Sequence, residues 1–303
     1  MKLLISGNVC LDNLKKQYIE SLGIETTFVQ DERIPLANQN INPAEFDMAV
    51  CNGLFLHNDI SEFKNLKYIQ LLSAGYDRVP LDYIKANNIT IFNARDVYSI
   101  PMAEFALCGV LQLYKQSKFF NSNQEKHIWD KHRGLLELFG KKVLIVGCGS
   151  VGTECAKRFD AFGCNVYGID LAPYENQYFK EIYSIDGIDE QLSNSDIVIL
   201  TLPLTEQTKD LFNNKRFAKM KNGACLVNIA RGPIVNQDDL INALKTKLFG
   251  AVIDVFNEEP LTESSQLWDL DNIIITPHNS FVGEGNNQRI FDCIIRNLEN
   301  YLK

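Results

Sequence analysis

The first hundred residues alternate between short apolar runs and segments with helical periodicity. The apolar runs are rich in Ile, Val and Leu, and they predict strands over 2–6, 26–29, 47–51, 68–72 and 89–93. Segments between them, such as 11–22 and 82–87, show the spacing of helices. Strands that alternate with helices predict a parallel sheet with helical crossovers.

A second alternating series fills most of the remaining chain. Its apolar runs are continuous rather than alternating, which is typical of parallel strands buried on both faces. These runs predict six strands, over 142–146, 165–169, 196–202, 225–229, 251–255 and 272–276. Helical patterns fall between most of them, including 151–162 and 238–246. Six strands with helical crossovers fit the two mononucleotide-binding halves of a doubly wound sheet.

Two segments lie outside these alternations. Pro101 opens a long apolar helical segment, and the polar stretch 121–134 that follows it is typical of an arm or linker. The last eighteen residues predict an amphipathic helix that packs back on the body. Its apolar face consists of Ile290, Phe291, Ile294, Ile295, Leu298 and Leu302.

Composition and charge narrow the class of protein. The 303 residues are 46% hydrophobic, which is enough for two domains. A formal charge of −8 argues against nucleic acid or an anionic membrane surface as the main partner. No signal peptide or membrane span is recognisable, and the eight scattered cysteines form no CxxC pair or metal-binding cluster. We therefore expect a cytoplasmic protein without disulfides or a bound metal.

The motif Gly147-x-Gly149-x-x-Gly152 follows a predicted strand and opens a predicted helix. Glycines in this position let the backbone approach a pyrophosphate, which the helix N-terminus attracts. Asp170 ends the next strand, where a carboxylate accepts hydrogen bonds from a ribose and repels a 2′-phosphate. The pattern indicates NAD rather than NADP, with FAD and S-adenosylmethionine as the competing cofactors.

Three polar side chains follow successive predicted strands. Arg231, Glu259 and His278 all fall where parallel strands end, which is where open α/β sheets bind ligands. Each alone is more often a surface or loop residue. Together, beside a dinucleotide motif, they indicate a carboxylate-binding arginine and a histidine whose proton a carboxylate controls.

The sequence resembles the D-isomer-specific 2-hydroxyacid dehydrogenase family over nearly its whole length. The resemblance rests on long runs in the family's order: QLLSAGYDRVP, MAEFALCGVL, VLIVGCGSVG, LTLPLTEQT, LVNIARGPIVNQDDLINALK, AVIDVFNEEPL and IIITPHNS. It implies a Rossmann NAD-binding domain over 98–282 and a flavodoxin-like substrate domain over 1–97 and 283–303. It also implies a homodimer formed through an arm at about 119–139.

The resemblance assigns the site residues. It implies that Arg231, Glu259 and His278 are catalytic, and that substrate contacts come from Ser73, Ala74, Gly75, Tyr76 and Arg231. It places the cofactor contacts at Gly147, Gly149, Ser150, Val151, Gly152, Asp170, Thr201, Leu202, Pro203, Thr208, Ala230, Asp254 and His278. Trp129 either approaches the partner's active site or anchors the dimer interface, and Phe281 restricts substrate size or covers the nicotinamide.

The implied reaction is hydride transfer between NAD and a small 2-keto or (D)-2-hydroxy acid. The resemblance implies that members acting on phosphoglycerate carry arginines in the loop after the third strand. Here that loop, 51–60, contains no Arg or Lys, which argues against a phosphorylated substrate. Phosphoglycerate dehydrogenase and glyoxylate/hydroxypyruvate dehydrogenase remain alternatives within the family. An NAD(H)-sensing corepressor-like protein is the alternative of another class, and a methyltransferase is a more distant one.

Overall fold

The computed structural model describes residues 1–6, 9 and 11–303 of the chain. Cys10, one of the cysteines counted above, lies outside the described residues. The chain divides into two compact units, Met1–Tyr98 with Gly283–Lys303, and Ser99–Val282. Both units contain an entirely parallel sheet, so the predicted fold class of two parallel α/β domains is confirmed.

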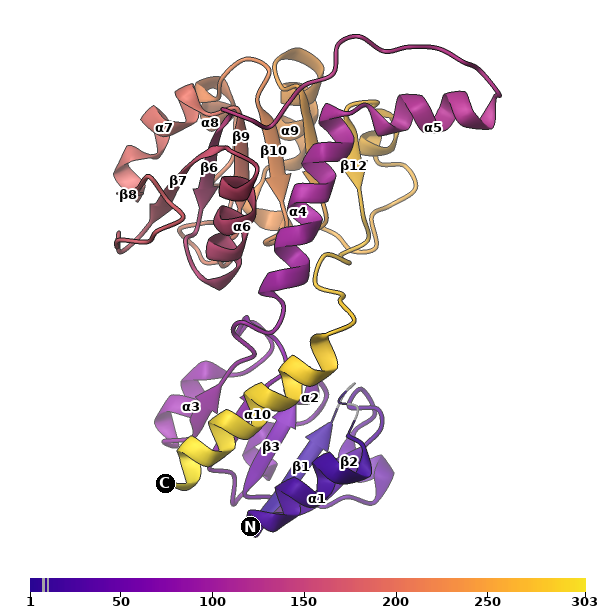
Figure 1. The fold of residues 1–303 in the computed structure, drawn as a ribbon. Helices are drawn as coiled ribbons and strands as arrows, with labels where there is room; N and C mark the ends of the chain where they lie inside the picture. The colour runs from indigo at the N-terminus through magenta and orange to yellow at the C-terminus, as the bar shows by residue number, and fades with distance from the viewer. Residues whose placement is uncertain (7–8, 10) are drawn as a thin grey trace. The chain divides into compact units, whose positions relative to one another are not determined.

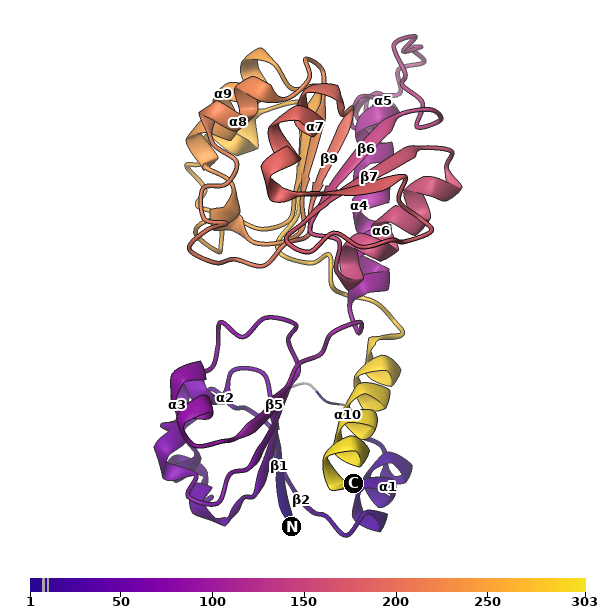
Figure 2. The ribbon, with the colours of Figure 1, turned by 90° about the vertical axis from the view of Figure 1, so that its left-hand side faces the viewer.

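The first unit is built on five strands, and Figures 1 and 2 show how its helices cover them. The strands are β1 (Lys2–Ser6), β2 (Glu25–Val29), β3 (Met48–Cys51), β4 (Tyr68–Leu71) and β5 (Thr90–Phe92). They pair in the order β2-β1-β3-β4-β5, which is the flavodoxin-like arrangement. Strands β1, β3 and β4 are almost fully buried, as central parallel strands must be.

Helices cover both faces of this sheet. On one face, α1 (Asn13–Ser21) and the C-terminal α10 (Asn286–Leu302) share an apolar cluster with β1, β3 and β4. On the other face lie α2 (Leu54–His57) and α3 (Leu81–Ala86), with their own cluster. The predicted amphipathic face of the C-terminal segment is thus confirmed, because Ile290, Ile294 and Leu298 are buried against the sheet.

The second unit contains seven parallel strands rather than the predicted six. They are β6 (Lys142–Val146), β7 (Asn165–Asp170), β8 (Glu181–Ser184), β9 (Ile197–Leu200), β10 (Cys225–Asn228), β11 (Gly250–Ile253) and β12 (Ile273–Ile275). Their order is β12-β11-β10-β9-β6-β7-β8. Numbered within this unit, the order is 3-2-1-4-5-6 with a seventh strand added at the edge, which is the Rossmann arrangement. The strand missed by the sequence, β8, is a short edge strand.

Helices pack on both faces of this second sheet (Figure 2). One face carries α4 (Ser99–Tyr114) and α6 (Ser150–Ala161), whose apolar residues cluster together with the strands. The other carries α7 (Ile188–Asn194), α8 (Asn214–Lys219) and α9 (Gln237–Thr246). The sheet order reverses between β6 and β9, so the switch point, where such sheets bind ligands, lies at their carboxyl ends.

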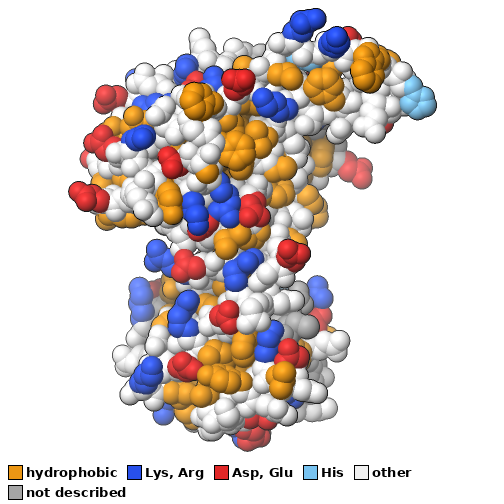
Figure 3. Space-filling model, viewed as in Figure 1, with side chains coloured by type: hydrophobic (Ala, Val, Ile, Leu, Met, Phe, Trp, Pro, Cys, Tyr) orange, Lys and Arg blue, Asp and Glu red, His pale blue; other side chains and the backbone are white. Residues whose placement is uncertain are grey.

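A projecting arm follows α4. It begins with α5 (Ser117–Glu125), a helix that extends into the polar segment 121–134 predicted as an arm or linker, and continues through residues 126–138 without regular secondary structure. Figure 3 shows apolar and basic side chains side by side on this part of the surface. Trp129 is 95% exposed and Phe139 is 81% exposed, which is unusual for large apolar side chains in an isolated unit.

Candidate functional site

The turn between β6 and α6 has the geometry of a dinucleotide cradle. Gly147 has φ +99°, and a Cβ there would lie 2.7 Å from the backbone nitrogen of Leu202. A Cβ on Gly152 would lie 2.1 Å from the Gly147 carbonyl oxygen, whereas a Cβ on Gly149 would have nothing within 4 Å. Two glycines are therefore required by packing, and the third leaves open space above the N-terminus of α6. That is the division of roles expected for a pyrophosphate-binding turn.

Asp170 ends β7 beside this turn. Its Oδ2 accepts a hydrogen bond from the Cys148 amide at 2.8 Å, and its Oδ1 accepts one from Ala172 at 3.2 Å. The carboxylate is half-buried, and no Arg or Lys occurs in residues 171–174. The residues present therefore fit the adenosine ribose of NAD, and residues 171–174 offer no cation to accept a 2′-phosphate.

Two further residues in the cradle were not identified from the sequence. Tyr174 donates its hydroxyl hydrogen to the Cys148 carbonyl and so covers the glycine turn. Burial, and secondly the Asp170 charge, raise the pKa of the Cys148 thiol to about 12. This cysteine therefore remains a neutral thiol and is not a nucleophile. A lone tyrosine or cysteine carries no sequence signal for either role.

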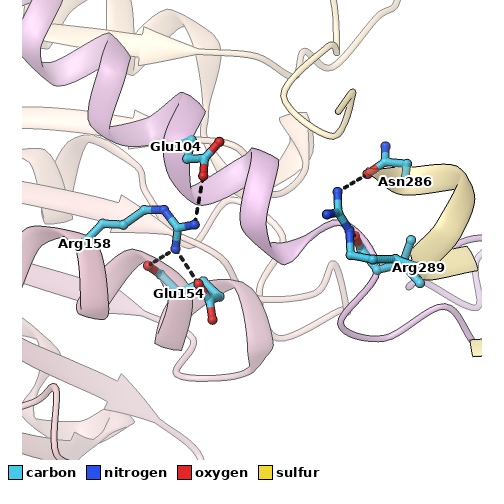
Figure 4. A network of polar contacts seen from close by, with 6 residues as sticks. Glu104, Glu154, Arg158, Asn286 and Arg289 are labelled. Atoms are coloured by element: carbon cyan, nitrogen blue, oxygen red, sulfur yellow. Dashed lines mark hydrogen bonds and ion pairs between the residues drawn. The ribbon is translucent and has the colours of Figure 1, made fainter. Parts of the chain in front are cut away.

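The cradle is anchored to the rest of the unit through α6. Arg158 on this helix forms ion pairs with Glu154 and with Glu104 of α4, as Figure 4 shows. The Arg158 side chain is 19% exposed, so the two carboxylates compensate a charge that is largely removed from water. The network joins the two helices on this face.

The loop after β9 supports the cradle from the other side of the switch point. The Thr201 hydroxyl donates to the Gly147 carbonyl at 2.6 Å, and the Thr208 hydroxyl donates to the Pro203 carbonyl at 2.7 Å. Leu202 is buried against Gly147. Thr201 to Pro203 thus lie where the sequence places the nicotinamide-side loop, although direct contact with the cofactor stays a prediction.

Arg231 follows β10 in a turn that tertiary contacts hold firmly. The buried Asn228 accepts from the Ala230 amide at 3.1 Å and donates to the Arg231 carbonyl at 3.0 Å. A Cβ on Gly232 would lie 2.0 Å from the Phe256 backbone. Asn228 and Gly232 are positioning residues that motif reasoning missed, because their importance comes from the close approach of two turns.

Glu259 and His278 meet at the carboxyl edge of β11 and β12. Glu259 Oε2 lies 2.8 Å from His278 Nδ1, and Glu259 Oε1 accepts from the Phe256 amide at 3.0 Å. The carboxylate therefore fixes the ring orientation and leaves Nε2 to exchange a proton. Phe281 contacts the same imidazole edge-to-face, with ring centroids 5.9 Å apart.

Asp254 holds the turn that carries His278. Its fully buried carboxylate accepts from the Thr276 hydroxyl at 2.7 Å, from Asn279 at 2.8 Å and from Ser280 at 2.9 Å. The His278 amide donates to the Asp254 carbonyl at 2.8 Å, which stabilises the left-handed backbone (φ +49°) at the histidine. The predicted contact of Asp254 with the cofactor remains a prediction.

The predicted substrate turn, Ser73 to Tyr76, follows β4 in the first unit. The Ser73 hydroxyl donates to the Gly75 carbonyl at 3.0 Å, and Asn93 donates to the Ala74 carbonyl at 2.7 Å. Within the part of the chain that the structure describes, no hydrogen bond from the Ala74 or Gly75 amide is found. The Ala74 and Gly75 amides can therefore donate to a ligand, while the carbonyls of the same two residues already accept hydrogen bonds.

The described residues contain no group of three or more His, Cys, Asp or Glu side chains placed to hold a metal ion. No helix among them has the length and apolar character needed to cross a bilayer. The seven cysteines of the described chain are free thiols.

Known proteins resemble this chain in sequence and in fold. Residues 107–280 match the family model of the D-isomer specific 2-hydroxyacid dehydrogenase NAD binding domain. A hydroxypyruvate reductase from Blautia hydrogenotrophica is 28% identical over 100% of this chain and 97% of its own length. A glyoxylate reductase from Thermofilum pendens is 32% identical, over 79% of this chain and 73% of its own. The crystal structure of a family member from Aeromonas salmonicida superposes with a TM-score of 0.82 at 26% identity, covering 99% and 95% of the two chains.

The chain therefore belongs to the D-isomer specific 2-hydroxyacid dehydrogenase family. It is an NAD-dependent dehydrogenase of that family, as the cradle and Asp170 independently indicate.

Proposed function

We propose that this enzyme reduces a small 2-keto acid to the (D)-2-hydroxy acid with NADH, or catalyses the reverse oxidation. The observation that carries the proposal is the 2.8 Å contact between Glu259 and His278 at the sheet edge that also carries Arg231. This pairing positions a proton-transfer group, and Arg231 supplies a planar cation suited to a carboxylate. A protein that only senses NAD(H) has no need of such a pairing.

Each residue has a defined role in the reducing direction. The Arg231 guanidinium binds the substrate carboxylate and polarises the keto oxygen. His278 transfers its Nε2 proton to the developing alkoxide, while Glu259 stabilises the imidazolium and holds its tautomer. The Ala74 and Gly75 amides donate to the substrate carboxylate. When bound, NADH supplies the hydride. The cofactor would be held by the turn at Gly147 to Gly152 and by Asp170.

The test is the loss of NADH absorbance during incubation with a panel of 2-keto acids. We expect turnover with at least one acid, and a lower KM for NADH than for NADPH because of Asp170. The panel includes glyoxylate, hydroxypyruvate and 3-phosphohydroxypyruvate, since relatives are named as hydroxypyruvate and glyoxylate reductases and as D-3-phosphoglycerate dehydrogenases. Tight NADH binding without turnover would identify the corepressor-like sensor instead, and no NADH binding would refute both.

We further propose that the enzyme is a cytoplasmic homodimer joined through the arm. A surface pocket of the arm is lined by Phe120, Asn123, Gln124, His127, Ile128, Trp129, Asp130, Lys131, His132 and Arg133. Its exposed aromatic and aliphatic residues are typical of an interface core, and the free thiols suit a reducing compartment. Sedimentation equilibrium should give twice the chain mass, and Trp129→Ala should weaken self-association. A monomeric wild type would contradict this assembly.

A further inference from the structure

Glu32 is a buried carboxylate at the carboxyl edge of the first sheet. It follows β2 and is 9% exposed. Its Oε2 accepts from the Ser6 hydroxyl at 2.6 Å and from the Asn52 amide at 3.1 Å, and its Oε1 accepts from the Gly53 amide at 2.6 Å. All three partners are neutral donors, which matches the acceptor-only character of an ionised carboxylate.

Among the residues that the structure describes, no Lys, Arg or His nitrogen forms an ion pair with Glu32. The adjacent Asp31 differs, because this half-buried carboxylate pairs with Arg33 at 2.9 Å. Glu32 therefore places a fixed and largely unscreened negative charge on this edge of the sheet.

The charge lies beside the proposed substrate turn. Strands β3 and β4 are neighbours, and their pairing continues beyond them through the Leu72 amide, which donates to the Cys51 carbonyl at 2.8 Å. The turn at Asn52 and Gly53, which Glu32 holds, and the turn at Ser73 to Tyr76 thus leave the sheet side by side. The next residues after Gly53 are apolar, and Leu56 is 58% exposed.

Glu32 also occupies the backbone donors of that turn. An anionic group on a substrate side chain would need the Asn52 and Gly53 amides, or a cation, to offset its desolvation. Both amides already donate to Glu32, and loop 51–60 contains no Arg or Lys. A second anion would therefore meet a like charge without a new donor.

We propose that Glu32 is a specificity-determining residue that excludes 2-keto acids with a second anionic group and so selects neutral aliphatic or aromatic side chains. This rests on the proposed function and adds the substrate class. Glu32 acts at a distance through its charge and through the amides it occupies, so it is a positioning residue and not a catalytic one. Leu56, which is exposed after this turn, offers an apolar surface to an uncharged side chain.

The experiment compares matched substrate pairs that differ in charge. 2-Oxopentanoate is paired with 2-oxoglutarate, and hydroxypyruvate with 3-phosphohydroxypyruvate. We expect the wild type to prefer the neutral side chain of each pair by at least about tenfold in kcat/KM. Glu32→Gln, which keeps the shape but removes the charge, should lower this preference by about tenfold, equivalent to about 1.4 kcal/mol. Asp31→Asn is the matched control, and it should leave the ratio unchanged because the Asp31 charge is already paired with Arg33.

The outcomes separate this inference from the proposed function. A wild type that reduces the acids but favours the member of each pair with the second anionic group would overturn the inference. That result would point to Arg78, three residues after Gly75, as the group that binds this second anion. An unchanged ratio in a folded Glu32→Gln variant would also overturn it. If that variant does not fold, the wild-type ratio alone decides. A wild type that reduces none of the acids refutes the proposed function, and the inference falls with it.

Discussion

Replacing His278 with alanine is expected to lower kcat by about 10²–10⁴-fold, the usual contribution of a general acid. The imidazole is the proposed proton-transfer group, and Glu259 Oε2 lies 2.8 Å from its Nδ1. The loss should appear in kcat measured by NADH absorbance, while the dissociation constant of NADH changes little because the cradle is intact. A kcat within a few fold of the wild type would show that His278 is not the acid.

Two further variants make this result specific. His127→Ala is the matched control, because His127 lies exposed in the arm and contacts no site residue. The double variant Glu259→Gln with His278→Ala should be no slower than His278→Ala alone, since residues that act as one unit are strongly non-additive. If the two losses multiplied instead, Glu259 would have a separate function in the reaction.

Much of the fold could be predicted because buried parallel strands have a plain sequence signature. The continuous apolar runs at 142–146 and 225–229 are matched by β6 and β10 within one residue. The missed β8 has two of its four side chains half-buried or buried and two exposed, so its pattern is that of an edge and not of a core strand. Helix α4 begins at Ser99, two residues before the predicted start, because proline is tolerated throughout the first turn.

The sequence predicts a catalytic trio, and its catalytic role stays a prediction, whereas the hydrogen bonds that hold these residues could not be predicted. Arg231, Glu259 and His278 stand in recognisable runs at strand ends. Asp254 also stands in such a run, yet its three hydrogen bonds join it to residues 22–26 positions later. The environment of Glu32 could not be predicted from the sequence, because no motif surrounds this acid. Its three hydrogen-bond donors, Ser6, Asn52 and Gly53, reach it only in the folded chain.

Arg231→Lys is expected to lower kcat/KM by about 10²–10³-fold, with kcat and KM both affected. The guanidinium offers a rigid fork to a carboxylate and still has a donor for the keto oxygen, whereas an ammonium is a compact point charge. The Arg231 turn is fixed by Asn228 and by the close approach of Gly232 to Phe256, so a lysine cannot regain the geometry through backbone movement. Steady-state kinetics with the best acid of the panel measure the effect.

Arg158→Lys provides the matched control for Arg231→Lys. Arg158 lies in the same unit and also binds carboxylates, those of Glu104 and Glu154, but it serves the packing of α4 and α6 (Figure 4). Its replacement should lower the thermal midpoint by a few degrees and leave kcat/KM within about threefold. Both variants replace an arginine with a lysine. Arg231→Lys should lower kcat/KM, whereas Arg158→Lys should lower the thermal midpoint. Equal kinetic losses in both would mean that Arg231 acts through stability, and the carboxylate-binding role would then be wrong.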